Sequence, residues 1–151
     1  MGDRVKIAVL PHGSLRREIF SAAAWERLGS LGDVAANEHD AANATPAEAA
    51  AMAKCARIVI TSWGSSEVGP EILAAAPDLD LHCHAAGTVK PYVTDAEWDS
   101  GVTVMSGAAA IAVSVAETTL GWMIIGTKRA LPANEVTSRG GWKAEMALPP
   151  G

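Results

Sequence analysis

A run of small residues follows an expected strand and could expose backbone amides to a ligand. Ala86, Gly87 and Thr88 come shortly after the apolar segment 79–84, and Lys90 follows two residues later. Side chains this small leave backbone N–H groups accessible, and converging N–H groups bind carboxylates or phosphates. Lys90 would supply a positive charge. The alternative is an ordinary tight turn with a solvated lysine, and the spacing alone slightly favours that alternative.

Two other loops also follow expected strands. One holds residues 11–14 (PHGS), and the other holds residues 62–66, which include Trp63 and Gly64. In an open parallel sheet, ligands bind beyond the carboxyl ends of the strands. These two loops therefore join residues 85–90 as candidates for a ligand site.

His82, Cys83 and His84 form a pattern that suggests a metal site. Side chains alternate between faces along a strand, so the two histidines share one face and Cys83 occupies the other. Two ligands do not complete a zinc site, and the sequence has no third ligand at a suitable spacing. We therefore expect no metal here and interpret both histidines as core or rim residues. His12 and His39 are isolated, and we expect them to be solvated.

Residues 113–131 predict a helix that is apolar on almost every side, with Glu117, Lys128 and Arg129 as its charged residues. A helix of this kind must be buried on every side, so another domain or a second copy of the chain has to cover it. Glu117 is then a buried carboxylate that hydrogen-bonds the backbone or a functional carboxylate. The structural role is favoured, because a buried carboxylate must find donors.

The elements that position these residues alternate along the chain. Apolar, β-branched segments predict five strands, and capped or amphipathic segments between them predict helices. The strands are expected at residues 5–10, 33–38, 57–61, 79–84 and 102–105, and the helices at residues 15–28, 47–55, 70–76 and 95–100. Such alternation predicts an α/β fold with a doubly wound, five-stranded parallel sheet. Residues 132–151 predict a loop-like tail.

Composition and charge exclude several classes of function. The 151 residues carry 12 Lys and Arg against 17 Asp and Glu, which gives a net charge of −5 without a basic cluster. We therefore expect no nucleic acid and no anionic membrane as partners. Two cysteines suit a reducing compartment, the first residues do not resemble a signal peptide, and the apolar run between Glu117 and Lys128 is too short to span a bilayer. These features predict a soluble, cytoplasmic protein.

Several well-known fingerprints are missing from the sequence. It contains no GxGxxG or GxxxxGK[ST] motif, which would indicate dinucleotide or nucleoside triphosphate binding. It contains no GxSxG motif, which would indicate a serine hydrolase. The residues themselves therefore predict an α/β domain with candidate ligand loops at the ends of its strands and no glycine fingerprint for a nucleotide.

Longer motifs carry a resemblance to a known family. LDLHCHAAGTV at residues 79–89 looks like the substrate loop, and SVAETTL at residues 114–120 looks like the start of the long interface helix, of D-isomer-specific 2-hydroxyacid dehydrogenases. Together with VLP, RIVITSWGS and RGGW, the order of motifs resembles the N-terminal portion of that family over nearly the whole chain.

The resemblance implies one half of a two-domain enzyme that transfers hydride between NAD(H) and a 2-hydroxy or 2-oxo acid. The first, flavodoxin-like domain of the family binds substrate, and the second, a Rossmann domain, binds the cofactor. Backbone amides of the loop that matches Ala86, Gly87 and Thr88 would hold the carboxylate of the acid. The loop that matches Trp63 and Gly64 would line the pocket. The long helix would bridge the domains and pack in a homodimer.

The sequence also departs from the family. Lys90, counted here among the substrate-binding residues, replaces a frequent Asp, and Ile111 stands where Asn or Thr is common near the cofactor. The family's GxGxxG and its catalytic Arg, acidic residue and His lie in the Rossmann domain, so we assign no catalytic residue in this chain.

These departures lead to an expected domain division and two hypotheses. We expect a substrate-binding domain at residues 1–112, an inter-domain and dimerisation helix at 113–131, and a tail at 132–151 that leads toward an absent NAD-binding domain. The chain alone is then expected neither to bind NAD(H) nor to be active. The alternative is a non-enzymatic α/β module that dimerises or binds a small acid.

Overall fold

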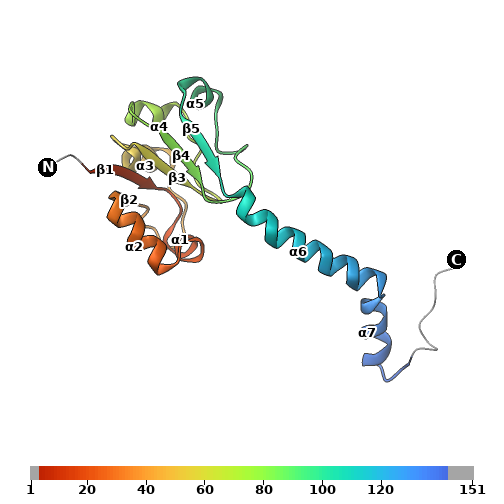
Figure 1. Cartoon of the computed structure of the whole chain (residues 1–151). Helices are drawn as coiled ribbons and strands as arrows, with labels where there is room; N and C mark the ends of the chain where they lie inside the picture. Colours follow the sequence, from red (N-terminus) through yellow and green to blue (C-terminus); the bar gives the residue numbers. More distant parts are fainter. Residues whose placement is uncertain (1–3, 143–151) are drawn as a thin grey trace. The chain divides into compact units, whose positions relative to one another are not determined.

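A computed structural model describes residues 4–142 of the chain. Its centre is one five-stranded parallel sheet with the order β2-β1-β3-β4-β5 (Figure 1). The strands are β1 (Val5–Val9), β2 (Gly32–Ala36), β3 (Ile58–Thr61), β4 (Leu81–His84) and β5 (Thr103–Ser106). The predicted α/β class and the doubly wound five-stranded sheet are confirmed, and each strand starts or ends within two residues of its expected bounds.

Alternation along the strands divides the core into two layers. Ala8 and Val59 face one side of the sheet and are fully buried, whereas Ile7 and Ile60 face the other side. The first side packs against α3 (Pro46–Ala53) and α4 (Pro70–Ala75), followed by α5 (Asp95–Ser100). The second packs against α2 (Ala22–Leu31) and against Phe20, which directly follows α1 (Gly13–Ile19). A strand buried on both faces has to be apolar there, which explains the run from Ile7 to Val9 in β1.

The helix expected at residues 15–28 is wrong in one respect, because the structure contains two helices there. The break falls at Phe20, which has extended backbone, and at Ser21, whose hydroxyl accepts a hydrogen bond from the amide of Ala24 at 3.2 Å. An extended residue followed by a serine N-cap starts a new helix. The N-cap of α1 is His12, whose imidazole accepts a hydrogen bond from the amide of Leu15.

A second compact unit comprises residues 110–151, and the first comprises residues 1–109. The long helix α6 spans Ala108–Thr127, so it starts five residues earlier and ends four residues earlier than predicted. The segment expected to be a loop-like tail contains helix α7 (Ala130–Ser138). Pro132 is tolerated there because the first turn of a helix does not need its N–H. The part of the predicted tail from residue 143 onward lies outside the described residues.

The apolar side chains of α6 are exposed in the described chain, including Val113, Trp122 and Met123. Glu117 is exposed as well in the single chain, and its burial under a second domain or a second copy stays a prediction. With 20 residues and little charge, α6 has the length and composition of a membrane-crossing helix, the one case within residues 4–142. Length and apolar character are equally typical of a helix that another protein surface covers.

Candidate functional site

The loops after β3 and β4 lie side by side at the carboxyl edge of the sheet. Because the two strands are parallel neighbours, Thr61 pairs with His84 at their ends. The amide of Ala85 donates to the Thr61 carbonyl at 2.8 Å, and the Ser62 hydroxyl donates to the Ala85 carbonyl at 3.2 Å. The structure therefore brings together the two loops that the sequence indicated, which hold Trp63 and Gly64 and residues 86–90.

Tyr92 connects these loops more tightly. Its hydroxyl accepts a hydrogen bond from the amide of Gly64 at 3.2 Å, and its ring stacks on the imidazole of His84 with centroids 4.3 Å apart. Trp63 is 54% exposed beside this contact, and Lys90 is exposed. The sequence analysis missed Tyr92, although an aromatic residue shortly after a small-residue loop is a recognisable signal.

In the loop of Ala86, Gly87 and Thr88, Gly87 is half-buried and Thr88 is exposed, whereas Ala86 is fully buried. Within residues 4–142, no hydrogen bond uses these three N–H groups as donors. The carbonyl of Ala86, by contrast, accepts from the amide of Gly107 at 2.9 Å, and this bond fixes the loop against the residue after β5. Backbone N–H groups without internal acceptors are strong partners for an ionised oxygen.

A side chain would have different consequences at Gly87 and at Gly64. No atom lies within 4 Å of the position that a Cβ of Gly87 would occupy, and its φ is not positive. Gly64 has a φ of +73°, and its Cβ would lie 2.6 Å from Nδ2 of Asn43. Gly64 is therefore required by the backbone, whereas Gly87 borders open space that a ligand could occupy.

In the third candidate loop, residues 11–14, two amides donate hydrogen bonds within the chain. Gly13 donates to the His39 carbonyl and Ser14 donates to the Asp40 carbonyl, both at 2.8 Å. His12 is half-buried rather than solvated, since its Nδ1 accepts from the amide of Leu15 at 3.3 Å. Because Gly13 and Ser14 use their amides within the chain, this loop is a weaker candidate for the ligand site than residues 86–88.

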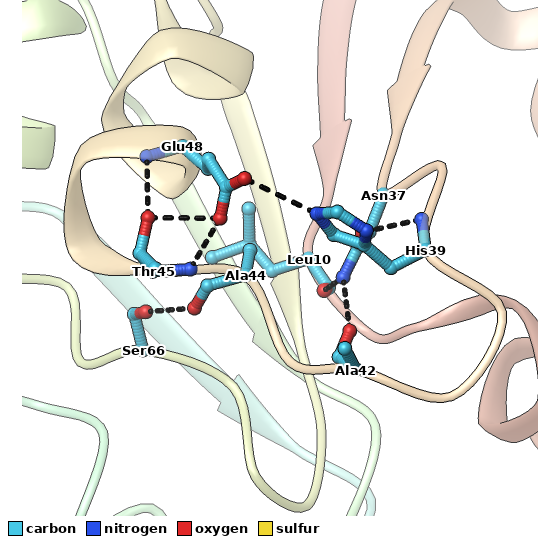
Figure 2. Close-up of polar contacts among 8 residues, drawn as sticks. All are labelled: Leu10, Asn37, His39, Ala42, Ala44, Thr45, Glu48 and Ser66. Atoms are coloured by element: carbon cyan, nitrogen blue, oxygen red, sulfur yellow. Dashed lines mark hydrogen bonds and ion pairs between the residues drawn. The ribbon is translucent and has the colours of Figure 1, made fainter.

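The loop between β2 and α3 is held in place by Asn37 (Figure 2). This buried side chain donates to the carbonyls of Leu10 and Ala42, both at 3.2 Å, and accepts from the amide of His39 at 3.0 Å. The Ser66 hydroxyl donates to the Ala44 carbonyl at 3.0 Å. The loop after β3 therefore contacts the loop between β2 and α3, whose Asn43 lies opposite Gly64.

The start of α3 in the same view is the capping box that the sequence predicts (Figure 2). The Thr45 hydroxyl accepts from the amide of Glu48 at 3.3 Å, and the Glu48 carboxylate accepts from the amide of Thr45 at 2.8 Å. Glu48 also lies 3.1 Å from Nε2 of His39, an exposed residue as expected. The hydrogen bonds from Thr45, followed by that from His39, lower the pKa of Glu48 to about 2.

His82 and His84 lie on the α4 and α5 face of the sheet and are buried, as predicted for core histidines. Nδ1 of His82 is 2.8 Å from Oε1 of Glu97, which belongs to α5. The hydroxyl oxygen of Thr61 lies 2.7 Å from Nε2 of His82 and 2.8 Å from Nδ1 of His84. Burial, followed by the proximity of His82, lowers the pKa of His84. Sequence reasoning missed this network because its members come from three elements.

Cys83 points to the opposite face, as strand alternation predicts. There it lines an apolar cavity of about 280 Å³ together with Ile60 and Met105. Burial raises the pKa of the Cys83 thiol. Within residues 4–142, no group of three or more His, Cys, Asp or Glu side chains has the geometry to hold a metal ion.

Comparisons with known proteins identify the fold. Neither the protein-family models nor the curated proteins gave a match. Among solved structures, a Pyrococcus horikoshii protein has a TM-score of 0.71 at 21% identity, over 94% of this chain and 39% of its own. An acyclic imino acid reductase in complex with NADPH and D-Arg has a TM-score of 0.69 at 15% identity, over 96% of this chain and 45% of its own.

A third similar structure is the NADPH-dependent glyoxylate/hydroxypyruvate reductase of Sinorhizobium meliloti in complex with citrate. It has a TM-score of 0.59 at 20% identity, over 97% of this chain and 42% of its own. The chain thus spans about two fifths of the length of these structures. The resemblance to 2-hydroxyacid dehydrogenases that the motifs indicate is confirmed at the level of the fold.

Proposed function

We propose that this chain is the substrate-binding part of an NAD(P)-dependent oxidoreductase that acts on a small 2-hydroxy or 2-oxo acid. The observation that carries the proposal is the loop of Ala86, Gly87 and Thr88, whose amides have no acceptor within the described residues. Support also comes from the fold, which is shared with glyoxylate and glyoxylate/hydroxypyruvate reductases and with an acyclic imino acid reductase.

In this proposal, the three amides bind the carboxylate of the acid. Lys90 contributes positive charge at the rim of the site, and Gly87 leaves room for the ligand. Trp63 and Gly64 line the second side, where the hydrogen bond from Gly64 to Tyr92 holds the loop in position. Binding of the carboxylate fixes the orientation of the neighbouring C2 atom, which is the atom that reacts. A domain that binds substrate contributes to catalysis by this positioning.

The nicotinamide cofactor supplies the hydride, and residues outside this chain would hold it. The sequence has no GxGxxG motif, and a helix N-terminus with that glycine pattern is what binds a dinucleotide pyrophosphate. The acid–base group of the reaction is likewise assigned to a second domain. The chain by itself is then inactive toward 2-oxo acids.

The exposed apolar helix α6 is assigned to a homodimer. Its side chains include Trp122 and Met123, at 60% and 62% exposure, and monomeric soluble proteins rarely leave such a surface uncovered. Burial of α6 in a dimer and against a second domain fits a soluble, cytoplasmic enzyme. The net charge of −5 argues against nucleic acid as a partner.

Two measurements test this division of roles. Titration calorimetry with NADH and NADPH should show no saturable binding to the 151-residue chain, and absorbance assays over a panel of 2-oxo acids should show no oxidation of either cofactor. Saturable binding in the micromolar range would contradict the proposal. The reading frame downstream separates the hypotheses, because an in-frame GxGxxG followed by a late histidine supports the dehydrogenase and an immediate stop codon supports a non-enzymatic module.

A further inference from the structure

Four side chains form a continuous buried line from α5 to the end of β4. Glu97, His82 and Thr61 are 0% exposed and His84 is 2% exposed. The line runs from Glu97 Oε1 to His82 Nδ1 (2.8 Å), from His82 Nε2 to Thr61 Oγ1 (2.7 Å), and from Thr61 Oγ1 to His84 Nδ1 (2.8 Å). Within the line the polar groups are hydrogen-bonded to one another, so the positions of their protons are coupled, whereas Oε2 of Glu97 and Nε2 of His84 have no partner within residues 4–142.

The hydroxyl of Thr61 allows only two arrangements. It has one proton and therefore donates to one imidazole and accepts from the other. If Nε2 of His82 carries a proton and donates, Thr61 donates to Nδ1 of His84, whose own proton must then be on Nε2. If Nε2 of His82 carries no proton, Thr61 donates to it and accepts from Nδ1 of His84. The Nε2 atom of His84 is then an acceptor.

We propose that Glu97, His82, Thr61 and His84 form a proton relay whose protonation state decides whether Nε2 of His84 donates or accepts a hydrogen bond. A proton that reaches Nε2 of His84 displaces the proton on Nδ1 to Thr61, and the former Thr61 proton moves to Nε2 of His82. His84 is neutral before and after this transfer. The added charge comes to rest on His82, beside the carboxylate of Glu97.

The surroundings explain why the charge rests on His82. A buried carboxylate without a counter-charge is costly, and a proton on His82 turns Glu97 into half of an ion pair. Burial and the neighbouring His82 lower the pKa of His84, so the outer imidazole is the poorer site for the charge.

The other groups near the line are apolar or face solvent. Ile72 of α4 is buried, and Val104 of β5 pairs with His82 in the register. The remaining acids of α4 and α5 are exposed: Glu71, Asp95 and Asp99. On the His84 side, the neighbouring titratable group is the Tyr92 hydroxyl, which already accepts from Gly64.

The outer end of the relay adjoins the candidate site. Nε2 of His84 is buried and has no hydrogen-bond partner within residues 4–142. The ring above it belongs to Tyr92, which holds Gly64, and the free amides of residues 86–88 follow His84 in the chain. If the proposed function holds, His84 is a positioning residue, and its donor form at lower pH favours a bound carboxylate.

Histidine-specific ¹⁵N labelling of the full chain tests the relay without any ligand. Long-range ¹H–¹⁵N spectra distinguish the two neutral tautomers and the imidazolium. On raising the pH, His82 should change from imidazolium to neutral, and over the same pH range His84 should invert from the Nε2–H to the Nδ1–H tautomer. The exposed His39, which contacts no other imidazole within the described residues, should show no tautomer inversion linked to His82. A His84 tautomer that stays the same across the titration of His82 would overturn the proposal.

Variants of Thr61 and Glu97 separate a relay from mere packing. Thr61→Val removes the hydroxyl and should abolish the inversion of His84, whereas Thr61→Ser should restore it. Inversion that persists in Thr61→Val contradicts the relay, and if that variant fails to fold, Glu97→Gln should hold His82 neutral and His84 in one tautomer. Oxalate titrated at two pH values tests the link to the site: binding with no pH dependence removes the link, and no binding at all contradicts the proposed function instead.

Discussion

Nδ1 of His82 lies 2.8 Å from Oε1 of Glu97, and neither side chain is exposed to solvent. Glu97 comes from the short helix α5, so this contact attaches that helix to the centre of the sheet. Breaking a buried pair by removing one partner leaves the other group without compensation, at a cost of about 3–5 kcal/mol.

Glu97→Ala should therefore lower the free energy of unfolding by about 3 kcal/mol or more. The control is Asp99→Asn, an exposed acid on the same helix, which should change it by less than about 0.5 kcal/mol. Urea unfolding followed by circular dichroism measures both. Equal effects of the two substitutions would show that the buried pair is not a structural anchor.

The two glycines of the candidate site should respond differently to a methyl group. Gly64→Ala forces a non-glycine residue to a φ of +73° against Asn43 and should cost about 1–3 kcal/mol of unfolding free energy. Gly87→Ala places its methyl in open space and should change stability by less than about 0.5 kcal/mol. Thermal and urea unfolding of both variants give the comparison. A large loss for Gly87→Ala would contradict the open space at that position.

Acid unfolding should depend on Glu48. The folded-state pKa of about 2 lies below the ordinary value of 4.5, so the carboxylate stabilises the folded chain above pH 4.5. That contribution is lost as the pH falls from 4.5 toward 2, because protonation ends the bonds to Thr45 and His39. Glu48→Gln keeps a capping side chain but cannot titrate. Unfolding free energies between pH 5 and pH 2.5 should fall less steeply in the variant, and identical slopes would contradict the assignment.

Self-association should depend on α6. Sedimentation of the chain at micromolar concentration should give a dimer, and Trp122→Glu should weaken it by about 2 kcal/mol or more, roughly thirtyfold. Trp98→Glu is the matched control, because Trp98 is 73% exposed on α5 and should leave the dimer intact. A monomeric wild-type chain would contradict the proposed dimer. Flotation with lipid vesicles would instead identify α6 as a membrane segment.

The strands and the loops at their carboxyl ends were predictable from sequence, because buried parallel strands are mostly apolar and Gly or Pro residues often follow them. The break between α1 and α2 was not predictable from the sequence, because Trp25 and Leu28 continue the helical spacing of apolar residues across Ser21. Helix α7 was not predicted because a proline such as Pro132 usually indicates a helix break. It is compatible with a helix only in the first turn, and the sequence does not show where that turn begins.

The site was predictable only in part. The small residues 86–88 indicate free amides. The sequence cannot show, however, that the amides of Gly13 and Ser14 donate hydrogen bonds to carbonyls of the neighbouring loop. The sequence also cannot show that Glu97 forms a hydrogen bond with His82, because that contact depends on how α5 packs against β4. Pairings between separate elements are set by tertiary packing, which local patterns do not encode.

The central claim is that the amides of residues 86–88 bind the carboxylate of a small acid, and chemical-shift mapping with oxalate or pyruvate tests it most directly. The amides of Ala86, Gly87 and Thr88 should shift first and that of Gly64 next, with an affinity on the order of millimolar because an exposed anion keeps much of its hydration. Gly87→Val should abolish these shifts, and Gly29→Val in α2, which also faces open space, should not. Shifts confined to the loop at residues 11–14, or none even at high ligand concentration, would contradict the account.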